Sequence, residues 1–68
     1  MQQLLDKLPP EWHATFLPPS ERAMREWWVV ELRGPYMRDP VINGKGDNAE
    51  LAMVDALVNL KKITGWAK

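Results

Sequence analysis

Few side chains in this sequence are of a type that could perform acid–base or nucleophilic chemistry. The chain of 68 residues contains no cysteine and one histidine, and its serine, Ser20, stands where a helix N-cap is expected. Catalysis needs titratable groups held together in a pocket. His13 has no catalytic partner in the surrounding sequence, and Asp39 has no second carboxylate to work with. We therefore expect a protein that is not an enzyme, with no catalytic residue, no cofactor and no metal site.

The segment Asn43–Gly46 has some features of an anion site. Glycine amides, a lysine and the positive end of a helix dipole together suit a phosphate group. The Lys-Ser/Thr pair of a P-loop is missing, and Asp47 and Glu50 are expected to occupy the helix-start amides and to repel an anion. We predict a turn before a self-capped helix here, and keep a small catalyst or anion binder centred on Lys45 as a third hypothesis.

The residues best suited to a function are of the types found at protein interfaces. Trp, Tyr, Met and Arg are enriched where proteins touch each other, and this short chain has 4 tryptophans. Trp27 and Trp28 differ by about 100° on a helix, so one of them is a candidate for an exposed anchor. The predicted partner-binding residues are Met24, Trp27, Trp28, Tyr36, Met37 and Arg38.

A nucleic-acid-associated regulatory factor is the second hypothesis. Its phosphate contacts would come from Arg22, Arg25, Arg38 and Lys45. Nine Lys and Arg balance nine Asp and Glu, so the chain has no general attraction for a polyanion. A helix-turn-helix needs a turn of about 3–4 residues between its helices, and here the segment 34–46 separates the two long predicted helices.

The segment 48–64 is the clearest helix in the sequence. Asp47 and Glu50 form a capping box at its start, and Gly65 followed by Trp66 is typical of a helix end. Apolar side chains occupy most of its circumference, whereas a surface helix needs only one apolar stripe. This helix must therefore be enclosed by the rest of the chain or by another molecule. Its narrow polar stripe consists of Asn48, Asp55, Asn59 and Lys62.

A second helix is predicted over residues 20–33. Ser20 is a good N-cap, and pairs of opposite charge spaced four residues apart support the helix. The run 27–30 also has high β-propensity, so a short strand there is the alternative. Gly34–Pro35 ends the element. Residues 34–46 are expected to form a long loop with a turn at Asn43–Gly44.

Two short helical turns are expected before the middle helix. Leucines at helical spacing mark residues 2–8, and prolines open the turn Pro10–Phe16, where Trp12 and Phe16 would share a face. The predicted fold class is all-α, as one domain over residues 1–68. It consists of the two turns, the helix 20–33, the loop and the long C-terminal helix 48–64.

Length and composition limit the class of protein. A chain this short buries a modest core, and without cysteine it has neither a disulfide nor a thiolate zinc site. Association with another subunit is a remaining source of stability. The chain lacks both a membrane-spanning run and a signal-peptide pattern, so we expect a cytoplasmic protein. The leading hypothesis is a non-enzymatic protein–protein interaction module that forms a homodimer, of the size class of phage or mobile-element accessory proteins that bind a host protein.

Overall fold

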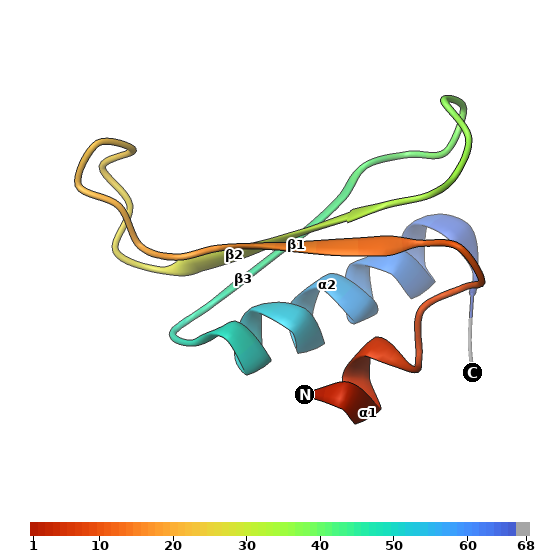
Figure 1. Ribbon diagram of the computed structural model, residues 1–68, viewed down its shortest axis with the longest axis horizontal. Helices are drawn as coiled ribbons and strands as arrows, with labels where there is room; N and C mark the ends of the chain where they lie inside the picture. The colour runs from red at the N-terminus through yellow and green to blue at the C-terminus, as the bar shows by residue number, and fades with distance from the viewer. Residues whose placement is uncertain (67–68) are drawn as a thin grey trace.

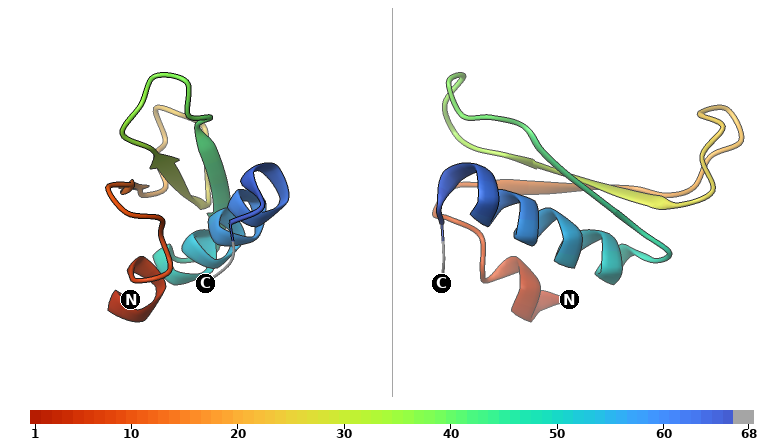
Figure 2. Two further views of the ribbon diagram at one scale, coloured as in Figure 1. Left: turned by 90° about the vertical axis from the view of Figure 1, so that its right-hand side faces the viewer. Right: turned by 180° about the vertical axis from the view of Figure 1, so that it is seen from behind.

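The computed structural model describes residues 1–66 and shows a small α+β fold (Figure 1). An antiparallel sheet has its strands in the order β1-β2-β3, and both helices lie on one side of it (Figures 1 and 2). The predicted all-α class, and with it the description as a small helical protein, is therefore wrong. The elements along the chain are α1 (Gln2–Leu5), β1 (His13–Leu17), β2 (Trp28–Arg33), β3 (Ile42–Gly46) and α2 (Ala49–Thr64).

Strand β2 replaces the second half of the helix predicted over 20–33. Val30 and Leu32 are fully buried, while Arg33 is exposed on the opposite side of the strand. This alternation has the period of two that a strand imposes on its side chains. The alternative prediction, a short strand at residues 27–30, therefore overlaps the observed strand β2. β2 pairs with a strand on each side, and these long-range pairings outweigh the local helix signals around Ser20.

Residues 18–27 form a hairpin loop where the helix was predicted to begin. Ser20 does not cap a helix, because its backbone exchanges two hydrogen bonds with the backbone of Arg25, each 3.0 Å long. The side chain of Arg25 closes the loop. Its Nη2 donates to the carbonyl of Pro18 at 2.7 Å and its Nε donates to the carbonyl of Trp27 at 3.1 Å. An arginine that the nucleic-acid hypothesis assigned to phosphate contact is thus a structural part of this loop.

Strands β1 and β3 occupy segments predicted as a helical turn and a loop. β1 takes up most of the predicted turn Pro10–Phe16. Trp12, just before β1, and Phe16 both pack against the core, as expected for residues an even number apart in extended chain. β3 takes up the end of the predicted loop 34–46, so Asn43–Gly44 lies inside a strand and is not a turn.

Strand β3 passes so close to α2 that its inward positions have no room for side chains. A Cβ atom on Gly44 would collide with the backbone carbonyl of Ala52 and the backbone nitrogen of Ala56. A Cβ atom on Gly46 would lie 2.6 Å from the backbone nitrogen of Ala52. Glycine in a strand often marks such a close approach of two backbones. The two glycines therefore serve strand–helix packing.

Helix α2 confirms the predicted C-terminal helix, with one change at its start. The N-cap is Asn48, whose Oδ1 accepts a 2.8 Å hydrogen bond from the N–H of Leu51, so the cap lies one residue after the predicted Asp47. Gly65 has a φ of 77° and donates its N–H to the carbonyl of Lys61, as a left-handed helix end requires. Neither helix within residues 1–66 has the length and apolarity of a membrane span.

The hydrophobic core lies between the sheet and α2. Half-buried side chains from α1, from the segment that follows it and from the C-terminal Trp66 surround the core. The indole Nε1 of Trp66 donates a 2.8 Å hydrogen bond to the carbonyl of Lys7 and joins the two ends of the described chain. The fully buried core residues are Val30, Leu32, Ile42, Ala52, Met53, Ala56 and Leu60.

Candidate protein-binding surfaces

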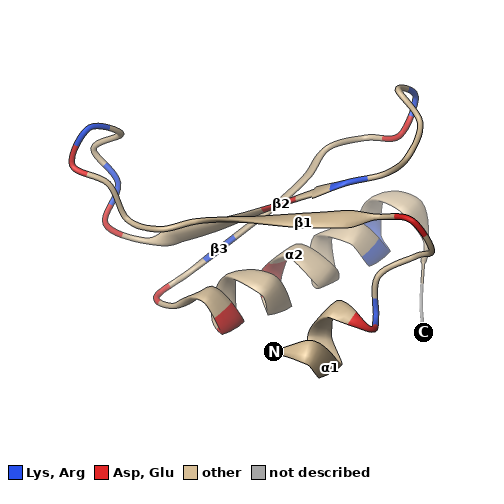
Figure 3. Ribbon diagram, in the orientation of Figure 1, with Lys and Arg blue, Asp and Glu red and all other residues tan. Residues whose placement is uncertain are grey.

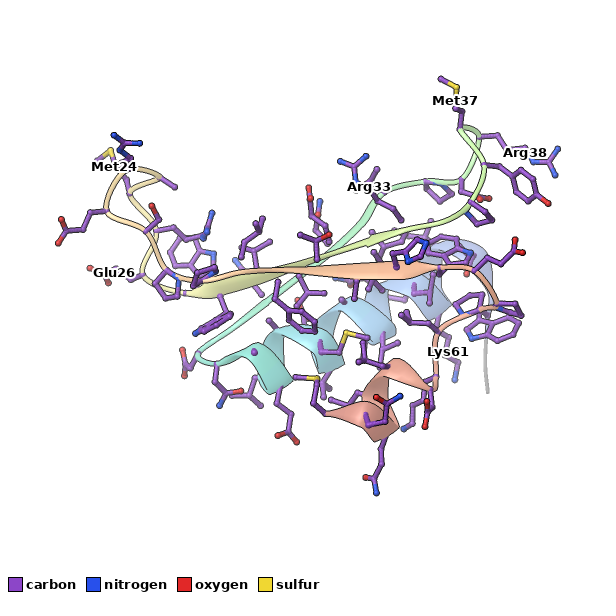
Figure 4. The ribbon with its side chains drawn as sticks, in the orientation of Figure 1. Met24, Glu26, Arg33, Met37, Arg38 and Lys61 are labelled. Atoms are coloured by element: carbon purple, nitrogen blue, oxygen red, sulfur yellow. The ribbon has the colours of Figure 1, made fainter. Side chains whose placement is uncertain are left out.

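The six residues predicted to bind a partner fall into two groups at opposite ends of the sheet. Met24 lies in the β1–β2 loop, whereas Met37 and Arg38 lie in the β2–β3 loop, and both loops project beyond the sheet (Figure 4). The reason is the hairpin topology, because successive antiparallel connections leave a strand at opposite ends. The structure therefore does not bring the predicted site together as one surface.

At the β1–β2 end, exposed apolar surface comes from Met24 and Trp27. Met24 is 89% exposed and has a φ of 51°, a left-handed conformation that is uncommon outside glycine. Trp27 is 42% exposed, and the Nζ of Lys45 lies 5.6 Å from its ring centroid. Trp28 points to the other face of the strand and packs against the core. Of the two adjacent tryptophans, Trp27 is therefore the one available for contact.

At the other end, the β2–β3 loop presents Met37 and a stacked Tyr36–Arg38 pair. Met37 is fully exposed, and the guanidinium carbon of Arg38 lies 5.1 Å from the ring centroid of Tyr36. The loop is held by Asp39, whose Oδ2 accepts a 3.0 Å hydrogen bond from the N–H of Tyr36. Asp39 thus has a structural partner in this turn.

A third apolar surface lies on α2, where the sequence named no partner-binding residue. The outward side chains Leu51, Val54 and Val58 are 51%, 43% and 46% exposed; we call them the α2 stripe. They follow the spacing of one helix face. The sequence predicted an unusually apolar helix that had to be enclosed. The sheet covers the opposite side of α2, so this face remains open within residues 1–66.

The α2 stripe continues into an open groove between α1 and the C-terminal end of α2. The groove has a volume of about 260 Å³. Two lysines, Lys7 and Lys61, also line it. Figure 4 shows Lys61 on the side of the molecule opposite Arg33 and the two loop tips. Its apolar lining comes from Leu4, Val54, Leu57, Val58, Leu60 and Trp66.

The four basic residues proposed for nucleic-acid contact do not form one patch. Arg22 and Arg25 lie in the β1–β2 loop and Arg38 lies in the opposite loop, while the guanidinium of Arg25 is occupied by two backbone carbonyls. Figure 3 shows acidic and basic residues interspersed along the chain. The candidate anion segment is also occupied, because the N–H of Lys45 donates to Oδ2 of Asp55 at 3.0 Å.

The chain was compared with protein-family models, with characterised proteins and with solved structures, and none of the three comparisons gave a significant match.

Proposed function

We propose that this chain is a non-enzymatic protein–protein interaction module whose main contact surface is the α2 stripe with its adjoining groove. The observation that supports the proposal is the exposure of Leu51, Val54 and Val58 on an ordered helix. Surface apolar residues scattered singly are ordinary, whereas contiguous ones beside a groove mark sites of contact.

The chemistry of the groove specifies the kind of partner. Its apolar lining suits the aliphatic or aromatic side chains of an amphipathic protein segment, as in other helix-and-groove contacts. Lys7 and Lys61 line the same groove, so acidic residues on that segment would complement it. The proposed partner is therefore a protein segment that combines apolar anchors with carboxylates. The proposal also places the chain in the cytoplasm, where a cysteine-free domain needs no oxidising environment.

Site-specific photo-crosslinking in the cell that makes the protein tests this proposal. A photo-reactive amino acid at Val58 should give one discrete protein adduct, and the same group at Arg33 on the opposite face should not. The adduct from position 58 should disappear when Leu51→Asp is added, and should weaken with Lys61→Glu. Equal labelling from both positions, or an adduct that survives Leu51→Asp, would contradict the proposal.

The contacts expected from the sequence stay predictions. The exposed ones form two groups, which the length of the sheet separates (Figure 4). One group is Met24 and Trp27, and the other is Tyr36, Met37 and Arg38. A crosslinker at Trp27 and another at Met37, used beside the one at Val58, measure whether either loop touches the same partner.

A further inference from the structure

The two edges of the sheet differ in how their backbone groups are satisfied. On β3, the carbonyl of Asn43 accepts a 2.7 Å hydrogen bond from the side-chain amide of Asn59, and the N–H of Lys45 donates to Asp55. Both partners come from α2, which packs alongside this strand. Side chains of α2 therefore occupy two of the outward backbone groups of β3, the carbonyl of Asn43 and the N–H of Lys45.

The register of the sheet identifies the groups on the other edge. The backbone groups of Asn43 and Lys45 point away from β2, so the pair Val30–Gly44 faces inward between β2 and β3. In an antiparallel ladder the next residue of β2, Glu31, then bonds to its β1 partner Thr15. The residues of β1 on either side of Thr15 consequently direct their N–H and C=O groups outward. These residues are Ala14 and Phe16.

The outward groups of Ala14 and Phe16 have no hydrogen-bond partner within the described part of the chain. Some of the backbone groups next to them along the chain do have partners. The N–H of Trp12 donates to the carbonyl of Pro9 at 3.2 Å. Pro18 has no N–H, and its carbonyl accepts from Arg25. The free edge is therefore a short segment with two donors and two acceptors.

The side chains of β1 do not protect this edge. Natural edge strands usually carry a lysine, an inward charge, a bulge or a covering element. The strand His13–Leu17 contains no Lys, Arg, Asp or Glu. Unpaired backbone groups on an uncharged strand are a template for another strand.

We propose that β1 pairs antiparallel with β1 of a second copy of this chain. Ala14 of each copy lies opposite Phe16 of the other, and the two Thr15 residues face each other at the two-fold axis. This register forms four backbone hydrogen bonds and uses every free group of Ala14 and Phe16. An interface in which the same patch serves both subunits is the usual form of a homodimer.

Neighbouring registers satisfy fewer of the free backbone groups of Ala14 and Phe16. Pairing Ala14 with Ala14 would place Phe16 opposite Trp12, whose N–H already bonds to Pro9. Pairing Phe16 with Phe16 would place Ala14 opposite Pro18, which has no N–H to donate. The bonded groups at each end of β1 therefore select the register centred on Thr15.

The proposed dimer is a continuous sheet of six strands with all helices on one face. The two-fold axis of an antiparallel strand pair is perpendicular to the sheet, so both copies keep their helices on the same side. Figure 2 shows α1 below β1 on that side, where it would meet its counterpart. The outer edges of the new sheet are the two β3 strands, where side chains of α2 already bond to the carbonyl of Asn43 and the N–H of Lys45, so addition of a third copy is disfavoured.

This inference rests on the proposed function, because it specifies one of the contacts of a protein–protein interaction module. Its test uses the purified chain alone. Sedimentation and native mass spectrometry over a concentration series should show a species of twice the 7.9 kDa chain mass. The amides of Ala14 and Phe16 should exchange more slowly with deuterium as concentration rises. A chain that stays monomeric at every concentration up to about 1 mM overturns the dimer, because a dissociation constant above that value is typical of only the weakest contacts.

Charge variants at Thr15 test the register. Thr15→Lys should raise the dimer dissociation constant at least roughly tenfold, because identical charges then face each other at the two-fold axis. Asn43→Lys is the control, since it adds the same charge to the same face at the covered edge. Thr15→Glu should weaken the dimer in the same way. Because the new carboxylate lies opposite Glu31 within the chain, its folding is checked by circular dichroism before use.

Mixing the two Thr15 variants gives the decisive result. Lysine opposite glutamate should restore pairing, so the mixture should contain heterodimers at concentrations where each variant alone is largely monomeric. Wild-type dimerisation by Thr15→Lys, or a mixture without heterodimers, overturns the β1 pairing. Neither failure contradicts the α2 stripe proposal, which is tested separately by the crosslinked adduct at position 58. Absence of that adduct, in turn, does not contradict the dimer.

Discussion

The side-chain amide of Asn59 on α2 donates a 2.7 Å hydrogen bond to the backbone carbonyl of Asn43 on β3. Asp55, one helical turn earlier, accepts from the N–H of Lys45 on the same strand edge. Asn59 and Asp55 belong to the narrow polar stripe that the sequence places on the C-terminal helix. The stripe serves the edge of the sheet, which explains why so apolar a helix keeps polar residues at these positions.

Replacing Asn59 by Ala should lower the free energy of unfolding by about 1 kcal/mol, because the carbonyl of Asn43 loses its donor. Adding Asp55→Ala should lower it further and leave the β3 edge open to other strands. Urea unfolding measures the first effect and light scattering on standing measures the second. Lys62→Ala is the control on the same helix, and equal aggregation in that variant would refute the role of the two caps.

Gly44→Ala should destabilise the fold by at least about 1–3 kcal/mol, the usual cost of overpacking. The added methyl would collide with the backbone of α2 at Ala52 and Ala56, which cannot rotate away as a side chain can. Thermal unfolding followed by circular dichroism measures the loss. Asn43→Ala is the matched control, since its side chain is on the exposed face of the same strand. A stable Gly44→Ala variant would show that β3 does not lie this close to α2.

Met24→Gly should raise the free energy of unfolding by about 0.5 kcal/mol. Relief of a left-handed φ of 51° is worth about 1–2 kcal/mol, and the greater freedom of glycine in the unfolded chain removes about 0.5–1 kcal/mol of that gain. Ala23→Gly provides the comparison, because it carries only the unfolded-chain cost and should destabilise. Chemical denaturation of the two variants should therefore give changes of opposite sign, and a shared sign would contradict the turn geometry.

Trp66→Phe should loosen the N-terminal segment. The phenyl ring keeps much of the apolar contact with the core but cannot donate to the carbonyl of Lys7, a loss of about 1 kcal/mol. The amides of α1 should then exchange several times faster with deuterium, as expected from about 1 kcal/mol. Trp27→Phe, on the outer face of the hairpin, should leave those amides unchanged. Unaltered exchange in Trp66→Phe would mean that α1 is held by packing alone.

The sequence by itself determined the C-terminal helix and its end at Gly65. These features depend on residues within one or two helical turns of each other, so local spacing and capping are sufficient to read them. The cap moved by one residue, from Asp47 to Asn48, because either side chain is suited to that role.

The tertiary structure alone decided the sheet. β3 has glycine at alternate positions and little β-propensity of its own, and it is a strand because β2 pairs with it and α2 packs onto it. Pairing energies come from residues distant in sequence and cannot be read from one segment. The same pairings decided that Trp27 is exposed while Trp28 packs on the core. They also decided that α2 keeps one apolar face open, and that side chains bond to the outward backbone groups of β3 but not to those of Ala14 and Phe16 on β1.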